Sequence, residues 1–392
     1  METPPLLLPA ALLFLLLCAA AFYIASARAS AASASRLFQG ASSCVLVTGA
    51  GSGIGLATAL AFSAAGSSVV LWDIDGAALA AAAAACAAQR GGGAVEARAV
   101  DVSDEGAVAA ACAALRARLP GGVVDVVVSN AGVVHGRDAE ALSAAEVRRS
   151  LDVNVGASFS LLRELRPAHR AARRGAWVLV SSCMGLVGSA RLADYVATKW
   201  ALLGLAESLR LELARDGLSG REVAVVAVAP YATRTAMFAG ILGGERGANA
   251  LREWLCPQLA AADVAAAVLA AVRRGGHALV VLPPVAGLAV AAMRALLPLG
   301  ACDALIGWAG GWHGMATFKG REGHQVGAAA PLEQPRRLEG RGRRDAAAAP
   351  RPGGEEEGRS RGSDAARQRR AGGREGLGAT SRQRAASRLT AR

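Results

Sequence analysis

The stretch Cys44-Val-Leu-Val-Thr-Gly-Ala-Gly-Ser-Gly-Ile-Gly55 decides the fold of this chain. Its apolar first half, residues 44–48, is typical of a buried parallel strand. Gly49, Gly53 and Gly55 then let the backbone turn sharply and approach a pyrophosphate, and a helix that opens near Ser52 offers its free amides to the phosphates. A flexible loop has a similar composition, but here a strand precedes the glycines and a helix, 56–65, follows them. The stretch therefore predicts a dinucleotide site that includes Thr48, Ser52 and Ile54.

Strands and helices alternate along the rest of the chain. Apolar runs predict strands at residues 68–73, 94–100, 123–129, 177–181, 222–228 and 278–282, with helices at 76–89, through 151–155 and over Tyr195. This alternation predicts an α/β fold, a doubly wound parallel sheet (Rossmann), within a single catalytic domain at 43–282. In such a sheet the ligands bind at the carboxyl ends of the strands.

Acidic residues stand at two of these predicted strand ends. Asp73 follows Gly55 by 18 residues, and its carboxylate can accept both ribose hydroxyls of an adenosine while repelling a 2′-phosphate. NAD is therefore preferred over NADP as the cofactor, and the neutral Ser52 agrees with this. The alternative is that Asp73 is an ordinary solvated turn residue. Asp101, at the end of the next strand, can reach the adenine amino group.

Tyr195 and Lys199 lie four residues apart, one helical turn, on the same face of a predicted helix. A phenol has an ordinary pKa of about 10, but an ammonium group within roughly 4–6 Å favours the phenolate and makes it a usable base. Ser182, at a strand end, could hold a substrate oxygen beside Tyr195. The pattern Tyr-x-x-x-Lys also occurs by chance in many helices, so this hypothesis depends on the rest of the chain.

Cysteine and charge exclude some classes of protein. The seven cysteines have no C-x-x-C spacing, so neither a disulfide framework nor a zinc site is indicated, and a reducing compartment is expected. Cys183 is interpreted as a packing residue beside Ser182 rather than a nucleophile. The net charge is +12, but residues 321–392 hold 17 arginines against nine acidic residues. The basic balance thus belongs mostly to the tail, and no specific nucleic-acid partner is predicted.

The two ends of the chain differ from its centre. Residues 5–26 are uncharged and apolar over about the length of a membrane-spanning helix, so 1–27 is predicted to be a hydrophobic membrane anchor, with a linker at 28–42. A cleaved signal peptide is the alternative, although no positive charge precedes the apolar run. Residues 283–320 are predicted to form an apolar membrane-associated or substrate-covering segment, with a second membrane-spanning helix as the alternative. The tail, 321–392, is predicted to be disordered.

Together these motifs resemble the short-chain dehydrogenase/reductase family over about residues 43–282. The glycine turn is similar to the family's Thr-Gly-x-x-x-Gly-x-Gly, and Ser182 precedes Tyr195 by the family's usual 13 residues. The resemblance implies that Asn154, Ser182, Tyr195 and Lys199 are catalytic. It also implies that the residues Asn130, Ala131, Tyr195, Lys199 and Thr235 contact the cofactor, in addition to the glycine-turn residues above.

Within the family the chain looks most like the membrane-bound retinol dehydrogenases and 17β-hydroxysteroid dehydrogenases, through Val133-Val-His-Gly136, Pro230-Tyr231 and the apolar amino terminus. This resemblance implies NAD-dependent interconversion of a lipophilic alcohol and its carbonyl, retinol and retinal foremost, with a steroid or fatty alcohol as the alternative substrate. A non-catalytic membrane or lipid-droplet protein of the same fold is a further alternative. The resemblance also implies an endoplasmic reticulum membrane or lipid droplet location, a catalytic domain that faces the cytosol, and a homodimer.

Two residues depart from the family pattern or are unusual for their position. Ser129 replaces an asparagine that the family often has, so a hydrogen bond that stabilises the sheet is in doubt. Trp200, directly after Lys199, is bulky and is expected to narrow the site.

Overall fold

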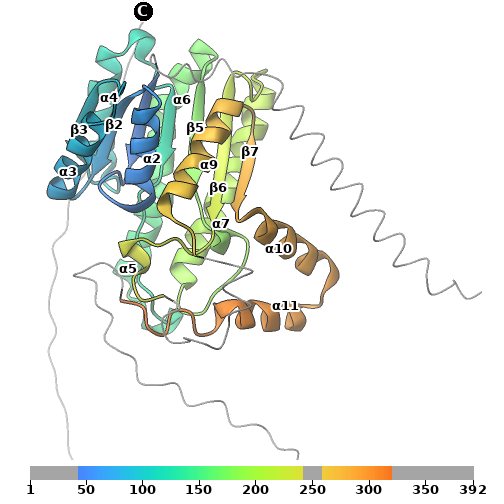
Figure 1. The fold of residues 1–392 in the computed structure, drawn as a ribbon. Coiled ribbons are helices and arrows are strands. Elements are labelled where there is room, and N and C mark those ends of the chain that lie inside the picture. Colours follow the sequence, from blue (N-terminus) through green and yellow to red (C-terminus); the bar gives the residue numbers. More distant parts are fainter. Residues whose placement is uncertain (1–42, 242–257, 320–392) are drawn as a thin grey trace, which may run out of the picture. The chain divides into compact units, whose positions relative to one another are not determined.

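Seven parallel strands form one sheet in the computed structural model of the chain, which describes residues 43–241 and 258–319. The sheet order is β3-β2-β1-β4-β5-β6-β7 (Figure 1). The strands are β1 (Cys44–Thr48), β2 (Ser68–Asp73), β3 (Val95–Ala99), β4 (Val126–Ser129), β5 (Gly175–Val180), β6 (Val223–Pro230) and β7 (Ala278–Leu282). The order reverses between β1 and β4, and ligands bind at such a reversal. The predicted doubly wound parallel sheet is therefore confirmed.

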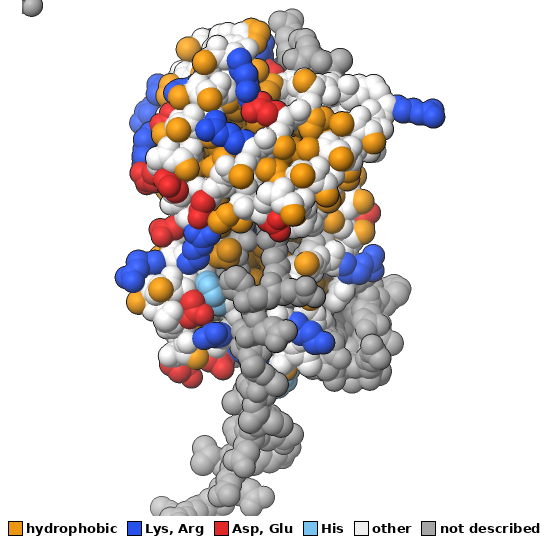
Figure 2. Space-filling model, turned by 90° about the vertical axis from the view of Figure 1, so that its left-hand side faces the viewer, with side chains coloured by type: hydrophobic (Ala, Val, Ile, Leu, Met, Phe, Trp, Pro, Cys, Tyr) orange, Lys and Arg blue, Asp and Glu red, His pale blue; other side chains and the backbone are white. Residues whose placement is uncertain are grey.

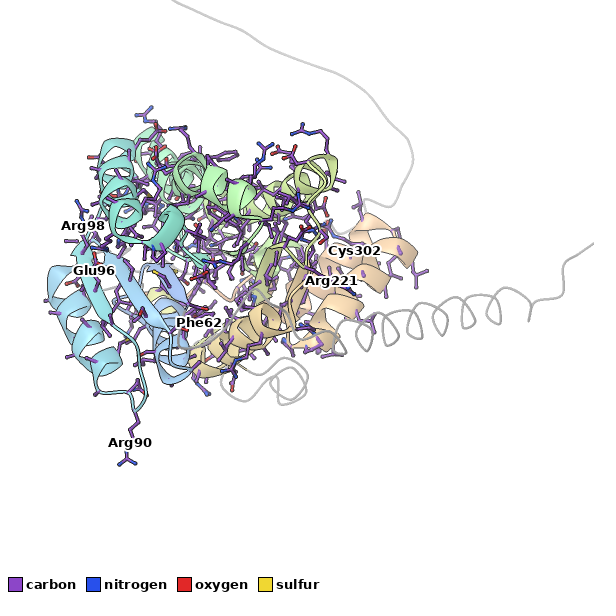
Figure 3. The ribbon with its side chains drawn as sticks, turned by 90° about the horizontal axis from the view of Figure 1, so that it is seen from above. Phe62, Arg90, Glu96, Arg98, Arg221 and Cys302 are labelled. Carbon is purple, nitrogen blue, oxygen red and sulfur yellow. The ribbon has the colours of Figure 1, made fainter. Side chains whose placement is uncertain are left out.

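Helices cover both faces of the sheet (Figure 3). One layer contains α2 (Gly53–Ala64), α3 (Gly76–Ala87) and α9 (Ala261–Arg274), and the other contains α4 (Glu105–Arg118), α6 (Ala157–Ala172) and α7 (Ala193–Arg215). Successive strand residues point to opposite faces, so Val45 and Val47 pack with Phe62 of the first layer, whereas Leu46 packs with Leu161 of the second. Because both faces are buried, the strands are apolar throughout, which is why the sequence shows continuous runs.

The outer surface at the β3 edge is built from short side chains. Alanine, the residue with the highest helix propensity, makes up most of α3 and forms much of its exposed side (Figure 2). Strand β3 lies at the edge of the sheet and carries Glu96 and Arg98 (Figure 3), with Glu96 paired to Arg118 of α4. Charged side chains on an edge strand oppose pairing with another chain.

The long helix predicted through residues 151–155 is interrupted. A capping box between Ser143 and Glu146 starts α5 (Ala144–Leu151), a single π-helical turn follows at Asp152–Gly156, and only then does α6 begin. A π-turn widens the backbone locally and is frequent at functional sites. Here it contains Asn154, one of the predicted catalytic residues.

Two short helices follow β7 in the region predicted to be a membrane-associated or substrate-covering segment. They are α10 (Pro284–Leu296) and α11 (Leu299–Ile306), and Figure 1 shows them beyond the carboxyl end of β7. Within the described ranges, no helix has both the length and the apolar character needed to cross a membrane. The predicted anchor at 1–27, the linker at 28–42 and the tail at 321–392 lie outside the described residues.

His169 of α6 is fully buried and gives the fold a pH dependence. Its ring stacks edge-on against Trp177 of β5, and Nε2 lies in hydrogen-bonding contact with the Val124 carbonyl at 2.5 Å. Burial lowers the pKa of His169 from 6.5 to about 4. In the unfolded chain His169 binds a proton as the pH falls below about 6.5, whereas in the folded chain the buried ring stays neutral until about pH 4. The contribution of His169 to the free energy of unfolding is therefore complete above pH 6.5 and is lost as the pH falls toward 4.

We expect the wild-type chain to lose about 2 kcal/mol more of its unfolding free energy between pH 7 and pH 5 than His169→Gln, because glutamine does not titrate. Urea unfolding at both pH values measures the difference. Equal losses in the two proteins would contradict the assignment of this pH dependence to His169.

Candidate active site

The glycine turn lies at the carboxyl end of β1 and the start of α2. Gly49 and Gly53 have φ of +66° and +57°, the left-handed region that favours glycine. Gly55 is held close to the same turn: a Cβ there would be 2.0 Å from the Gly49 carbonyl oxygen. The backbone of residues 49–55, at the turn and the amino end of α2, therefore carries no side chain where a ligand would approach it. We call this backbone surface the cradle. This is the feature that a bound diphosphate requires, so the dinucleotide fits here.

Side chains join the glycine turn to the loop that follows β4. The Thr48 hydroxyl oxygen accepts hydrogen bonds from the amides of Asn130 at 3.0 Å and Ala131 at 3.1 Å. The side-chain Nδ2 of Asn130 donates a hydrogen bond to the backbone carbonyl of Thr48 at 2.9 Å. Ser129, whose role was in doubt, is within hydrogen-bonding distance of Ser158 of α6 at 2.8 Å between hydroxyl oxygens, so it ties β4 to the helix layer.

Asp73 ends β2 directly beside the glycine turn, as predicted. Its carboxylate accepts hydrogen bonds from the Gly51 amide at 2.8 Å and the Asp75 amide at 3.1 Å. These two bonds hold the carboxylate in place next to the cradle. The interpretation of Asp73 as an ordinary solvated turn residue is wrong, since it is only 7% exposed.

Asp101 has protein partners in this structure. Its carboxylate accepts from the Ser103 hydroxyl at 2.6 Å and from the Arg149 guanidinium at 3.1 Å. Desolvation raises the pKa of Asp101, but the bonds from Ser103 and Arg149 outweigh it and leave the pKa below the ordinary value. Contact with an adenine would have to share this carboxylate with Arg149.

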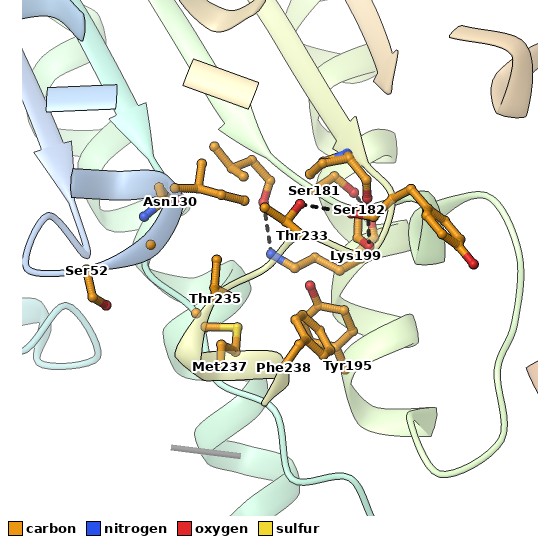
Figure 4. A pocket seen from close by; sticks show the side chains of 16 residues that line it. Ser52, Asn130, Ser181, Ser182, Tyr195, Lys199, Thr233, Thr235, Met237 and Phe238 are labelled. Atoms are coloured by element: carbon orange, nitrogen blue, oxygen red, sulfur yellow. Dashed lines mark hydrogen bonds between the residues drawn. The ribbon is translucent and has the colours of Figure 1, made fainter. Parts of the chain in front are cut away.

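One pocket joins the glycine turn to the predicted catalytic residues (Figure 4). Ser182 lies just after β5 and Tyr195 and Lys199 lie on the first turns of α7. In Figure 4 the Tyr195 hydroxyl points toward the side chains of Lys199 and Ser182. The predicted site residues that line the pocket are Ser52, Gly53, Ile54, Asn130, Ser182, Tyr195, Lys199 and Thr235. Thr235 lies against Gly53, where an added Cβ would be 3.2 Å from the Thr235 methyl carbon.

The ionisation of the tyrosine and lysine differs from the expectation. Burial raises the pKa of the Tyr195 phenol, and a hydrogen bond with Ser182 only partly opposes this. Burial also lowers the pKa of Lys199 to about 8. The Lys199 ammonium lies 5.3 Å from the centre of the Tyr195 ring and donates to the Val180 carbonyl at 2.8 Å. The net shift of the Tyr195 pKa is therefore upward rather than downward as expected, and burial is its largest cause.

Asn154 lies behind the pocket in the π-turn rather than in its lining. Its carbonyl oxygen accepts from the Val133 amide at 2.8 Å, and its amide nitrogen donates to the Thr198 hydroxyl at 3.0 Å. A Cβ on Gly132 would be 3.4 Å from the Asn154 carbonyl oxygen and 3.8 Å from the Lys199 ammonium nitrogen. Asn154 and Lys199, which the resemblance implies are both catalytic, therefore both lie close to Gly132.

Trp200 does not narrow the site. It is 40% exposed and its ring faces the Arg294 guanidinium of α10 at 4.6 Å. Residue 200 follows Lys199 by about 100° around the helix, which turns its side chain away from the pocket.

The structure adds residues that sequence patterns did not single out for the site. Gly132, Thr233, Met237 and Phe238 line the pocket, and Phe238 stacks edge-on against Tyr195 at 5.6 Å between ring centres. Loop residues carry no periodicity, so only the preceding strand ends could have indicated them: Ser129 for Gly132, and Pro230 for the other three. Among the described residues no group of three or more histidine, cysteine or acidic side chains could hold a metal ion.

Comparison with known proteins agrees with this geometry. The family model described as short chain dehydrogenase matches residues 43–245, and the chain belongs to this family. Epidermal retinol dehydrogenase 2 of Mus musculus is 33% identical over 196 residues, which cover 50% of this chain and 62% of that protein. Estradiol 17-beta-dehydrogenase 11 of Homo sapiens is 33% identical over 176 residues, covering 45% and 57% respectively. The chain thus spans about three fifths of the length of these curated relatives.

A solved structure gives the same result for the fold. A short-chain dehydrogenase from Sphingobium yanoikuyae in complex with NADPH superposes with a TM-score of 0.53 at 29% identity, covering 68% of this chain and 96% of that chain.

Proposed function

We propose that this protein is an NAD(H)-dependent oxidoreductase that interconverts a lipophilic alcohol and its carbonyl compound, with Tyr195 as general acid and base. The observation that carries the proposal is the single pocket that places Ser52 and Gly53 of the glycine turn opposite Ser182, Tyr195 and Lys199. The family membership and the relatives named as retinol and estradiol dehydrogenases support it.

Each of the side chains Ser182, Tyr195, Lys199 and Asn154 has its own role in the proposed reaction. Ser182 holds the substrate oxygen, and Tyr195 exchanges a proton with that oxygen. The raised pKa keeps Tyr195 protonated, and the protonated phenol is the form that donates a proton to a carbonyl. In alcohol oxidation Tyr195 first releases its own proton toward solvent, and the positive charge of Lys199 stabilises the resulting phenolate. The phenolate then accepts the proton of the alcohol. Asn154, beside Lys199, is placed to connect it to solvent through water. The nicotinamide cofactor supplies the hydride carrier when bound, so no metal is needed.

The substrate class follows from the lining and the relatives. Met237 and Phe238 give the pocket an apolar side next to Tyr195. Such a wall favours a hydrocarbon skeleton over a sugar or a hydroxy acid. Retinol and retinal are proposed first, because a relative is named as a retinol dehydrogenase, and a hydroxysteroid or a long-chain fatty alcohol second. Turnover of retinol, estradiol and a long-chain alcohol by membranes that carry the protein tests this. Lack of turnover of all three would refute the substrate class.

Asp73 is proposed to select NAD over NADP. We expect Asp73→Asn to lower the ratio of kcat/KM with NAD to that with NADP at least tenfold, because the charge that repels a 2′-phosphate is lost while hydrogen-bond acceptance is retained. Asp75→Asn is the matched control: Asp75 is exposed and caps α3, and asparagine caps equally well. The control should keep the ratio within twofold. An unchanged ratio in Asp73→Asn would remove Asp73 from cofactor selection.

Membrane association is proposed through α10, α11 and the turn that follows, and it fits a location on the endoplasmic reticulum or lipid droplets with the catalytic domain toward the cytosol. No residue of α10 is buried. Large apolar side chains are exposed along this segment and the neighbouring strand: Leu279, Val285, Leu288, Leu296, Leu297, Leu299, Leu305, Trp308 and Trp312. Exposed leucines with tryptophans suit the interface of a lipid bilayer.

Brominated phospholipids quench tryptophans that enter a bilayer. We expect Leu288→Glu combined with Leu299→Glu to reduce this quenching by at least half, because two charges must then leave water. Leu211→Glu, on the exposed side of α7, is the control and should not change it. Equal quenching in all proteins would exclude this surface as the lipid contact. A homodimer is a further expectation from the family.

A further inference from the structure

Two rows of buried hydrogen bonds join the three segments that carry the candidate site. The segments are the loop after β4, the end of α5 with its π-turn, and the first turns of α7. The first row is that of Asn154, which bonds to Val133 and Thr198. The second row has no part in the proposed mechanism: the Ser150 hydroxyl donates to the Asp194 carboxylate at 2.6 Å, and the His135 Nδ1 lies 2.8 Å from the same oxygen.

The second row repeats the first at regular spacing. Ser150 precedes Asn154 by four residues, and Asp194 precedes Thr198 by four, so each pair lies one helical turn apart on one face. His135 follows Val133 by two residues in the loop. Each segment therefore contributes one residue to each row. Two separate sets of hydrogen bonds, one turn apart, connect the three segments.

The burial of the second row makes it energetically demanding. Ser150 is fully buried, and His135 and Asp194 are 8% and 7% exposed. The Oδ1 atom of Asp194 is buried and has no hydrogen-bond partner among the described residues. The orientation of this carboxylate thus rests on Ser150 and His135, both acting on Oδ2. A carboxylate held in this way strongly resists displacement, because losing either donor leaves charge unsatisfied away from water.

We propose that Asp194, Ser150 and His135 are positioning residues for the reaction, a proposal that rests on the function proposed for Tyr195. Asp194 directly precedes Tyr195, so the row sets the place of the first turn of α7 relative to Asn154 and the loop of Gly132. The phenol oxygen and the Lys199 ammonium are held by this turn. A displacement of about 1 Å in a reacting group can cost about 100-fold in rate. The glycine turn and Asp73, which are proposed to hold the diphosphate and the adenosine, lie outside the row, so we expect the row to affect kcat much more than cofactor affinity.

The expected result is a separation of kcat from cofactor binding. Asp194→Ala should lower kcat at least tenfold and leave the dissociation constant for NADH within twofold, and Ser150→Ala should lower kcat in the same direction. The double variant should be no worse than Asp194→Ala alone, because both substitutions break one unit. Asp194→Asn, which still accepts a bond from Ser150, should recover part of the rate. Stopped assays well below each melting temperature and NADH fluorescence measure these quantities.

Asp125→Ala is the matched control for a merely structural effect. Asp125 is also 7% exposed, accepts from the Cys44 amide at 2.8 Å and pairs with Arg174 at 3.0 Å, but it lies at the amino-terminal end of the sheet. It should lower the melting temperature and leave kcat within twofold. If Asp194→Ala and Ser150→Ala kept kcat within twofold, the proposal would be overturned. If Tyr195→Phe itself kept its turnover, the function of the site would fail instead, which is a separate outcome.

Discussion

Replacing Tyr195 by phenylalanine is expected to lower kcat at least about 1000-fold while NAD(H) binding stays within about threefold. The substitution removes the hydroxyl that points toward Ser182 and Lys199 and leaves the ring in place. That ring packs edge-on against Phe238 and lies in the cluster of Met315 and Phe318, so the fold has no reason to change. Steady-state turnover of retinol together with NADH fluorescence titration measures both quantities.

The chain offers a matched control for this change. Tyr231 lines the same pocket, and its hydroxyl contacts the Ala309 carbonyl at 3.4 Å. Tyr231→Phe removes a phenolic hydroxyl that bonds to Ala309, so it should keep kcat within about fivefold. Turnover of Tyr195→Phe within tenfold of wild type would mean that another group moves the proton.

A methyl group on Gly55 should cost both stability and cofactor binding. The added Cβ of Gly55→Ala would be 2.0 Å from the Gly49 carbonyl oxygen and 2.6 Å from the Asn130 amide nitrogen, far inside contact distance. The start of α2 must then move away from the turn, which we expect to cost at least about 2 kcal/mol. The same movement opens the cradle for the diphosphate, so NADH affinity should fall at least tenfold. Urea unfolding and NADH fluorescence are the measurements.

Gly204→Ala adds the same methyl group but is expected to raise the free energy of unfolding rather than lower it. Gly204 lies exposed within α7 and an added Cβ there meets nothing within 4 Å. Alanine should stabilise the helix by up to about 1 kcal/mol and leave NADH binding unchanged. The cradle would have to be reconsidered if Gly55→Ala unfolded and bound NADH as the wild type does.

Several parts of the site could be predicted because they depend on short spacings. The turn between β1 and α2 is a local pattern of glycines, and Asp73 follows it by one helix and one strand. Tyr195 and Lys199 lie on one face whenever their segment is helical. The carboxyl ends of parallel strands meet at one edge of a sheet, so residues far apart in the sequence were expected together, and the pocket that contains Ser52 and Tyr195 agrees.

Other parts could not be predicted because they depend on burial. The direction in which the pKa of Tyr195 shifts is decided by how much water the surrounding side chains remove, and the hydrogen bond with Ser182 opposes this effect only in part. The interruption of the long helix by a π-turn leaves no periodic signal. The contact of the Trp200 ring with Arg294 of α10 joins two segments far apart in the sequence, and no local pattern indicates it.

The order of amino acids alone was enough for the sheet, the dinucleotide cradle and the pairing of Tyr195 with Lys199 on one helix face, because each follows from backbone chemistry and periodicity within a few tens of residues. The assignment of Asn154 to the site came from the family resemblance. Only the folded chain decided that His135 and Ser150 contact the Asp194 carboxylate, and in which direction the pKa of Tyr195 shifts. These properties arise between side chains that are 15 to 59 residues apart, and they depend on distances and on exclusion of water that exist only once the helices have packed on the sheet.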